Sequence, residues 1–273
     1  MNWALWKKGL LDIWLLLAVC SALLLLFGWV FVWFTSLFRL GAWATMLNAV
    51  PSSLQPMFGV PLAQLASPAG QISMIFVHPI PTVICVGWAI GRGSDAVSGE
   101  IGRGTMEMLL TLPVRRVSVL VVPAIFSTLG AAALAASLWM GAWLGIATVD
   151  LHARLDIGQF LPGAINLFAL TFCLTGLTAF CSSWDHNRWR TMALAAGFYV
   201  VSLLIQLVAR VWHAGRWVKY LTFLTAFEPQ QLILVPGSES LAWRYNGTLA
   251  AIGLVSYAAA AVIFTFRDIP QPR

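Results

Sequence analysis

The residues best suited to specific chemistry lie in 91–116, the most polar stretch of the chain. On a helix with about 100° per residue, Glu100, Arg103 and Glu107 fall within one narrow arc. Apolar side chains take the opposing side, and these are Val97, Ile101, Met108 and Leu112. The pattern predicts an amphipathic helix over 97–112 that lies parallel to a membrane and is ended by Pro113. Its charged face suits contact with another protein, and the alternative is a solvated loop with no partner.

A second compact polar stretch, 184–190, separates two apolar runs and contains Asp185, His186 and Arg188. An Asp–His pair could act as a general base, but no nucleophile or second acid accompanies it in the sequence. We therefore interpret this turn as a second contact for the same partner and as a topology anchor.

Other chemistry finds little support. The chain has no G-x-x-x-x-G-K-[ST] sequence, so it forms no Walker A phosphate cradle, and any ATPase must be another chain. The stretch 91–96 matches G-x-G-x-x-A, but it follows an apolar run rather than a strand, so it does not indicate a dinucleotide site. The four histidines are far apart, and the four cysteines include no C-x-x-C pair. We therefore expect no catalytic residue, metal or cofactor in this chain.

His78 is the ionisable residue inside an apolar run, where such residues are functional candidates by default. Pro79 and Pro81 follow it. The alternative, which we favour, places His78 near the outer membrane interface, with the prolines kinking the helix.

The composition defines the elements that must position these residues. Of the 273 residues, 60% are apolar and only 10% are charged, against roughly 25% charged in soluble domains. This excludes a soluble enzyme and a disordered chain, and it favours an all-α polytopic membrane protein formed by residues 1–273 as a single domain. A span needs about 20 apolar residues. Six runs qualify, at approximately 11–34, 72–90, 117–148, 160–182, 191–211 and 248–266.

The distribution of basic residues predicts the orientation. One side of the predicted topology holds ten basic residues, which are Lys7, Lys8, Arg92, Arg103, Arg115, Arg116, Arg188, Arg190, Arg267 and Arg273. The other side holds six, which are Arg39, Arg154, Arg210, Arg216, Lys219 and Arg244. Both termini are therefore expected in the cytoplasm, with the protein in the cell inner membrane. The net charge of +6 reflects topology, since no clustered basic face indicates nucleic-acid binding.

The connections are unequal. Residues 1–10 carry tryptophans and lysines before the first span, which predicts a short helix at the membrane interface. The outer connections 35–71 and 212–247 are long, and the aromatic residues of the second suit a segment at headgroup level.

The polar stretch also resembles a known family. Its pattern is Glu100-x-x-x-Gly104-Thr105-x-Glu107-x-Leu109-Leu110-x-x-Pro113, followed by Arg115-Arg116 and a long apolar run. This is similar to the motif of the type-2 permease superfamily of ATP-binding cassette (ABC) exporters, where it lies in the cytoplasmic loop between spans two and three. The six-span plan and the N-terminal interfacial helix, called the elbow helix in that family, resemble it as well.

The resemblance implies a mechanism. Two permease copies, as a homo- or heterodimer in the lipid bilayer, would form an export pathway, and each would dock on a cytoplasmic ABC ATPase subunit that holds the ATP and Mg. The coupling helix between spans two and three would transmit ATPase closure, with Glu100, Arg103, Gly104, Thr105, Glu107 and Pro113 as coupling residues. Asp185, His186 and Arg188 would form the second coupling turn. The alternative function is a membrane anchor or membrane-embedded enzyme of a maturation or redox complex.

Overall fold

The computed structural model describes residues 3–37, 40–51, 54–106, 116–151 and 154–266. These residues form helices and connecting turns, and no strand occurs among them. The predicted all-α class is confirmed.

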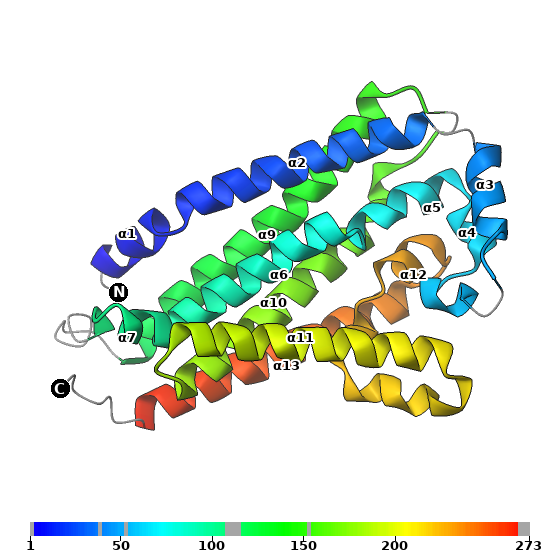
Figure 1. The fold of residues 1–273 in the computed structure, drawn as a ribbon. Helices are drawn as coiled ribbons and strands as arrows, with labels where there is room; N and C mark the ends of the chain where they lie inside the picture. The colour runs from blue at the N-terminus through cyan, green and yellow to red at the C-terminus, as the bar shows by residue number, and fades with distance from the viewer. Residues whose placement is uncertain (1–2, 38–39, 52–53, 107–115, 152–153, 267–273) are drawn as a thin grey trace.

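Six helical segments within the described ranges are long and apolar enough to cross a membrane, as predicted. They form one elongated bundle in which α7 and the start of α1 lie at one end and α3 and α4 lie at the other (Figure 1). The end of α13 lies at the same end as α1, so the described chain begins and finishes on one side. The six segments are Trp6–Ser36, Pro68–Gly102, Val117–Thr148, Ile157–Trp184, Arg188–Val211 and Glu239–Phe266.

The first segment comprises α1 (Trp3–Leu11) and α2 (Trp14–Ser36), separated by a turn. The helix predicted at 1–10 therefore exists as α1, and its position at a membrane interface stays a prediction. The indole of Trp6 meets the Phe126 ring edge-on, with 5.3 Å between ring centroids. This contact holds α1 against α9 (Arg116–Thr148).

The second segment is longer than the predicted 72–90, because it continues without a loop to Gly102. A π-helical turn, η3, connects its main helix to a final short turn, so the polar residues after 90 remain within the rod. His78 does not lie in a kinked continuous helix. It is the N-cap of α6, where its side chain accepts a hydrogen bond from the backbone N–H of Ile80. The parts are α5 (Pro68–Ser73), η2 (Met74–Phe76), α6 (Pro79–Ser94), η3 (Asp95–Gly99) and α7 (Glu100–Gly102).

The centre of the bundle is α10 (Leu161–Trp184), which has buried residues along its whole length and packs against α6, α9, α11 and α13. The fifth span is α11 (Arg188–Val211). The sixth, α13, runs over Glu239–Phe266 and begins well before the predicted residue 248. The length of the apolar run underestimated the length of α13, because the first turns of this helix carry polar and exposed residues. A helix tolerates such residues beyond the hydrocarbon core.

Glycines let α2 and α9 approach closely. A Cβ on Gly141 of α9 would lie 2.2 Å from the backbone oxygen of Leu25, and one on Gly28 would lie 2.8 Å from that of Leu138. Such small residues are typical of helix contacts in membranes, where close backbone approach replaces the hydrophobic driving force.

The end of the bundle that carries α3 is covered by short helices. One of them, α12, packs against α10 and α5, and Leu232 on it is buried (Figure 1). The segment 212–247, predicted to lie at headgroup level, therefore turns partly back into the bundle. The fourth span begins with η4 (Ile157–Phe160). The short elements outside the spans are α3 (Leu40–Asn48), η1 (Gln55–Phe58), α4 (Leu62–Leu65), η5 (His213–Leu221), η6 (Phe223–Ala226) and α12 (Pro229–Leu234).

Candidate functional site

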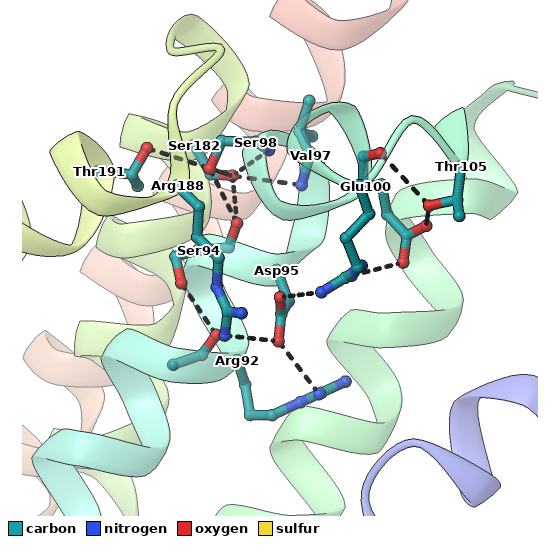
Figure 2. A network of polar contacts seen from close by, with 12 residues as sticks. Arg92, Ser94, Asp95, Val97, Ser98, Glu100, Thr105, Ser182, Arg188 and Thr191 are labelled. Carbon is teal, nitrogen blue, oxygen red and sulfur yellow. Dashed lines mark hydrogen bonds and ion pairs between the residues drawn. The ribbon is translucent and has the colours of Figure 1, made fainter. Parts of the chain in front are cut away.

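Residues from both predicted coupling stretches meet at the α7 end of the bundle (Figure 2). The meeting point combines the end of the second span with the last turn of α1 and the start of α11. We call Lys8, Arg92, Asp95, Glu100, Arg103, Thr105 and Arg188 the charged network.

Glu100 is one centre of the charged network. Its carboxylate accepts hydrogen bonds from Lys8 Nζ at 2.9 Å to both oxygens, and from Arg103 Nη2 at 2.9 Å. The Thr105 hydroxyl donates to the Oε2 atom at 2.5 Å. Glu100 is only 9% exposed, so these partners replace water around a carboxylate that would otherwise be costly to bury. The Lys8 contact ties α1 to the end of the second span.

Asp95 is the other centre. Its oxygens lie 3.4 Å from Arg92 Nη1, 2.9 Å from Arg103 Nη1 and 3.2 Å from Arg188 Nη2. The Arg188 contact joins the start of α11 to the second span (Figure 2). Partial burial alone would lower the pKa of Arg103, but the hydrogen bonds and charges of Asp95 and Glu100 raise it above its ordinary value. Arg103 therefore remains charged and bridges both carboxylates.

A cavity of about 410 Å³ opens beside the charged network. Both carboxylates line it, together with Lys8 and Arg92 and with Asp12 from the turn after α1. Four cationic side chains of the charged network thus share two carboxylates at the wall of a polar cavity. Such an arrangement can respond to charge or contact changes nearby, because its ion pairs are partly shielded from water.

Three hydroxyl groups, those of Ser98, Ser182 and Thr191, hold the π-helical turn in place. The Ser182 hydroxyl of α10 accepts from the backbone N–H groups of Val97 at 3.2 Å and Ser98 at 2.9 Å. It also lies 3.0 Å from the Ser94 carbonyl oxygen, to which it can donate. Thr191 on α11 donates to the Ser98 hydroxyl at 3.1 Å (Figure 2). The widened turn is therefore stabilised from two neighbouring spans, and π-turns of this kind are frequent at functional sites.

The helix predicted over 97–112 is interrupted, which corrects that expectation. It ends after Gly102, and Gly104 adopts the left-handed conformation with φ of 69°. The Gly104 N–H bonds the Ile101 carbonyl at 3.0 Å, and the Thr105 N–H bonds the Glu100 carbonyl at 3.1 Å. These two bonds are the Schellman arrangement that closes a helix at a glycine. Met106 is again helical, so the turn at Gly104 separates Glu100 and Arg103 from it.

The remaining predicted residues separate into two groups. Glu107 and Pro113 lie outside the described residues. Asp185 accepts from the backbone N–H groups of His186 at 2.7 Å and Asn187 at 3.1 Å, so it shapes the second turn. The side chain of His186 is exposed on that turn. Of the three residues predicted for the second turn, Arg188 is the one that joins the charged network.

Sequence reasoning missed three members of the charged network. Lys8 was interpreted as an interface and topology charge, while Arg92 and Asp95 were attributed to the loop after a shorter second span. The i, i+3 spacing of Arg92 and Asp95 was a usable signal for a helical ion pair. No signal in the sequence connects residue 8 with residue 100.

A second polar centre lies at the opposite end of the bundle. Glu228 is paired with Arg210 and lies 3.3 Å from Gln206 Nε2. Its backbone N–H donates to Asn166 Oδ1 at 3.0 Å, and Asn166 Nδ2 donates to Asn246 Oδ1 at 2.8 Å. Burial raises the pKa of Glu228 above its ordinary value, although Arg210 and Gln206 act in the opposite direction.

The fold and the charged network define a polytopic helical membrane protein whose polar centre ties the N-terminal helix and the fifth span to the end of the second. The family model described as ABC-2 family transporter protein matches residues 11–269. The chain therefore belongs to the ABC-2 transporter family and is a transmembrane permease subunit, as the sequence resemblance implied. No curated protein matches the chain.

Family membership settles the broad class. ABC-2 permeases are the membrane subunits of transporters and not themselves catalytic, and the family implies partnership with an ABC ATPase. Within the described ranges, no group of three or more His, Cys, Asp or Glu side chains could hold a metal ion.

Proposed function

We propose that this chain forms an export pathway that a separate cytoplasmic ATPase drives, and that the charged network transmits ATPase movement to the spans. The proposal places the charged network, the loop after it and both termini in the cytoplasm, with the protein in the inner membrane. The ten-to-six division of basic residues supports this orientation. A second permease copy would complete the pathway, as the family resemblance implies.

One observation carries the proposal. Residues 107–115 directly follow, in the sequence, a segment whose side chains are paired with α1, through Lys8 and Glu100, and with α11, through Arg188 and Asp95. A force applied to these residues by a docked ATPase would therefore reach three spans rather than one. The ion pairs of the charged network provide the connection, and the short turn at Gly104 separates it from the docking segment.

This division of labour refines the role of each predicted coupling residue. Glu100 and Arg103 face partners within the chain, so we assign them to transmission. We assign Glu107 and Pro113 on the loop, with His186 on the second turn, to docking. Asp185 and Gly104 shape the turns, and Thr105 fixes the Glu100 carboxylate.

The test is recovery of the ATPase with the tagged chain from native membranes. The docking variant carries Glu107→Lys and His186→Glu, and the control carries Glu239→Lys at the opposite end of the bundle. Misplaced charges at a protein contact cost roughly 2–5 kcal/mol, so the docking variant should recover little ATPase at equal membrane levels, while the control recovers it normally. Normal recovery by the docking variant would contradict the assigned docking surface. Absence of any ATP-hydrolysing partner from the wild-type preparation would contradict the proposed function as a whole.

A further inference from the structure

A second cavity, of about 350 Å³, is lined by residues of α2, α3 and the second span. Figure 1 shows α3 at the end of the bundle opposite α7. Aromatic and methionine side chains, including Phe31, Trp43, Met46 and Met74, form much of its wall. The volume falls within the roughly 300–1,000 Å³ of small-molecule sites.

Gln71 supplies an unsatisfied donor in this apolar wall. Its side chain lines the cavity, and the residue is 7% exposed. The buried Nε2 atom has no hydrogen-bond partner among the described residues. An unpaired buried amide is destabilising, and a ligand with a hydrogen-bond acceptor would remove that penalty. Water would fit poorly, because an ordered water needs two to four polar partners and this wall is almost wholly apolar.

His78 provides a second polar group in the same wall. Its Nδ1 atom accepts from the Ile80 N–H at 3.3 Å, which assigns the proton of the neutral ring to Nε2. The imidazole packs against two neighbouring rings, with centroid distances of 4.9 Å to Phe27 and 5.7 Å to Phe31. The wall therefore offers hydrogen-bond donors and apolar surface, but no carboxylate.

The rim of the cavity is exposed on the apolar surface of the bundle. Phe34 is 50% exposed and Met46 is 61% exposed, and both line the cavity. In a membrane this surface faces acyl chains, so a hydrocarbon chain can enter from the side. We propose that the cavity binds one acyl chain of a bilayer phospholipid, whose ester carbonyl accepts a hydrogen bond from Gln71 Nε2. Lipid binding at this cavity requires membrane insertion but no coupling to an ATPase. A failure of the lipid-binding proposal and a failure of the proposed transport function are therefore distinguishable.

The test uses the full-length chain in nanodiscs that contain a diazirine-labelled phosphatidylethanolamine. One preparation carries the label on an ester-linked chain, and the other carries it on an ether-linked chain of equal length without the carbonyl. After irradiation, mass spectrometry compares labelling of 31–46 and 71–79 with labelling of the exposed apolar face of α11. The cavity peptides should be labelled well above the α11 reference with the ester lipid, and less with the ether lipid.

Two variants complete the test. Gln71→Leu removes the donor at similar size and should reduce ester-lipid labelling of the cavity roughly three- to tenfold, while ether-lipid labelling stays unchanged. Thr35→Phe fills the cavity and should reduce labelling by both lipids to the α11 level. Cavity labelling no stronger than that of α11 would overturn the site. Equal labelling of the wild-type cavity by both lipids would overturn the role of Gln71, and this outcome does not depend on how any variant folds.

Discussion

Two carboxylates bind four cationic side chains at one end of the bundle. Each carboxylate connects the end of the second span to a different helix. Glu100 binds Lys8 of α1, while Asp95 binds Arg188 of α11. Arg103 contacts both carboxylates, so a change at either reaches the other. Because Glu100 and Asp95 are mostly buried, loss of one partner leaves charges without compensation rather than exposing them to water.

We therefore expect Glu100→Gln to destabilise the chain by about 1–3 kcal/mol, since Lys8 and Arg103 lose a charged acceptor. Lys8→Met should destabilise it less, because Arg103 and Thr105 still compensate Glu100. The double variant should lose less than the sum of the two single changes, as coupled residues do. Thermal unfolding in detergent measures all three, and Glu239→Gln at an exposed helix start is the control. Strictly additive effects would contradict a direct Lys8–Glu100 interaction.

The carboxyl of Glu228, at the other end of the bundle, should make the stability of the chain depend on pH. Burial raises the pKa of this carboxyl above the ordinary 4.5, so the folded chain holds this proton more tightly than the unfolded chain. Its contribution to stability is full below the ordinary pKa and is lost as the pH rises through the folded value. As the pH rises above the ordinary pKa of 4.5, the melting temperature of wild type should fall relative to that of Glu228→Gln. Parallel profiles of the two proteins would contradict a raised pKa.

At the scale of elements, the turn at Gly104 separates two segments that the residue pattern joined into one helix. The periodicity of 97–112 alone does not reveal a helix break at a single glycine. The Arg103-Gly104 pair was the available signal, because glycine is the preferred residue just beyond a helix C-terminus. The break places the charged residues Glu100 and Arg103 before the turn at Gly104, and the predicted docking residues follow it in the sequence.

Two glycines near this turn provide a matched comparison. A Cβ on either Gly102 or Gly104 meets no atom within 4 Å, so only backbone conformation distinguishes them. Gly104→Ala should cost about 1–2 kcal/mol because of its positive φ. Gly102→Ala should be neutral or stabilising by up to about 1 kcal/mol, since its position is helical. Unfolding measurements on both variants test this, and equal effects would contradict the left-handed turn.

The sequence predicted the fold class, the number of spans and most span limits, because each depends on apolar runs about 20 residues long. It also brought Glu100, Arg103, Thr105 and Arg188 forward as site residues. It could not place Lys8 beside Glu100 or Ser182 beside Ser98, since these contacts join residues more than 80 positions apart. The early start of α13 was missed for a different reason, because its first turns are too polar to register as part of a span.

At the scale of the whole molecule, the chain has a charged network at one end and short helices with an apolar cavity at the other. The spans α6, α10 and α11 run between these ends and are in mutual contact. Movement applied to the residues that follow the charged network can therefore be transmitted along these helices to the far end of the bundle. This geometry suits a subunit that converts movement of a docked ATPase into opening of a pathway.

The most direct test of this central claim measures the far end while the ATPase changes state. In a chain whose four native cysteines are replaced, Gln55→Cys in η1 reports access at the exposed far end. Its reaction rate with an impermeant maleimide is measured in the reconstituted permease–ATPase complex, without nucleotide and with ATP plus vanadate. With the charged network intact, we expect the two rates to differ roughly fivefold or more, at the lower end of typical coupling energies. With Asp95→Asn and Glu100→Gln together, the rates should become equal although the ATPase remains bound. An unchanged nucleotide effect in that variant would contradict transmission through the charged network.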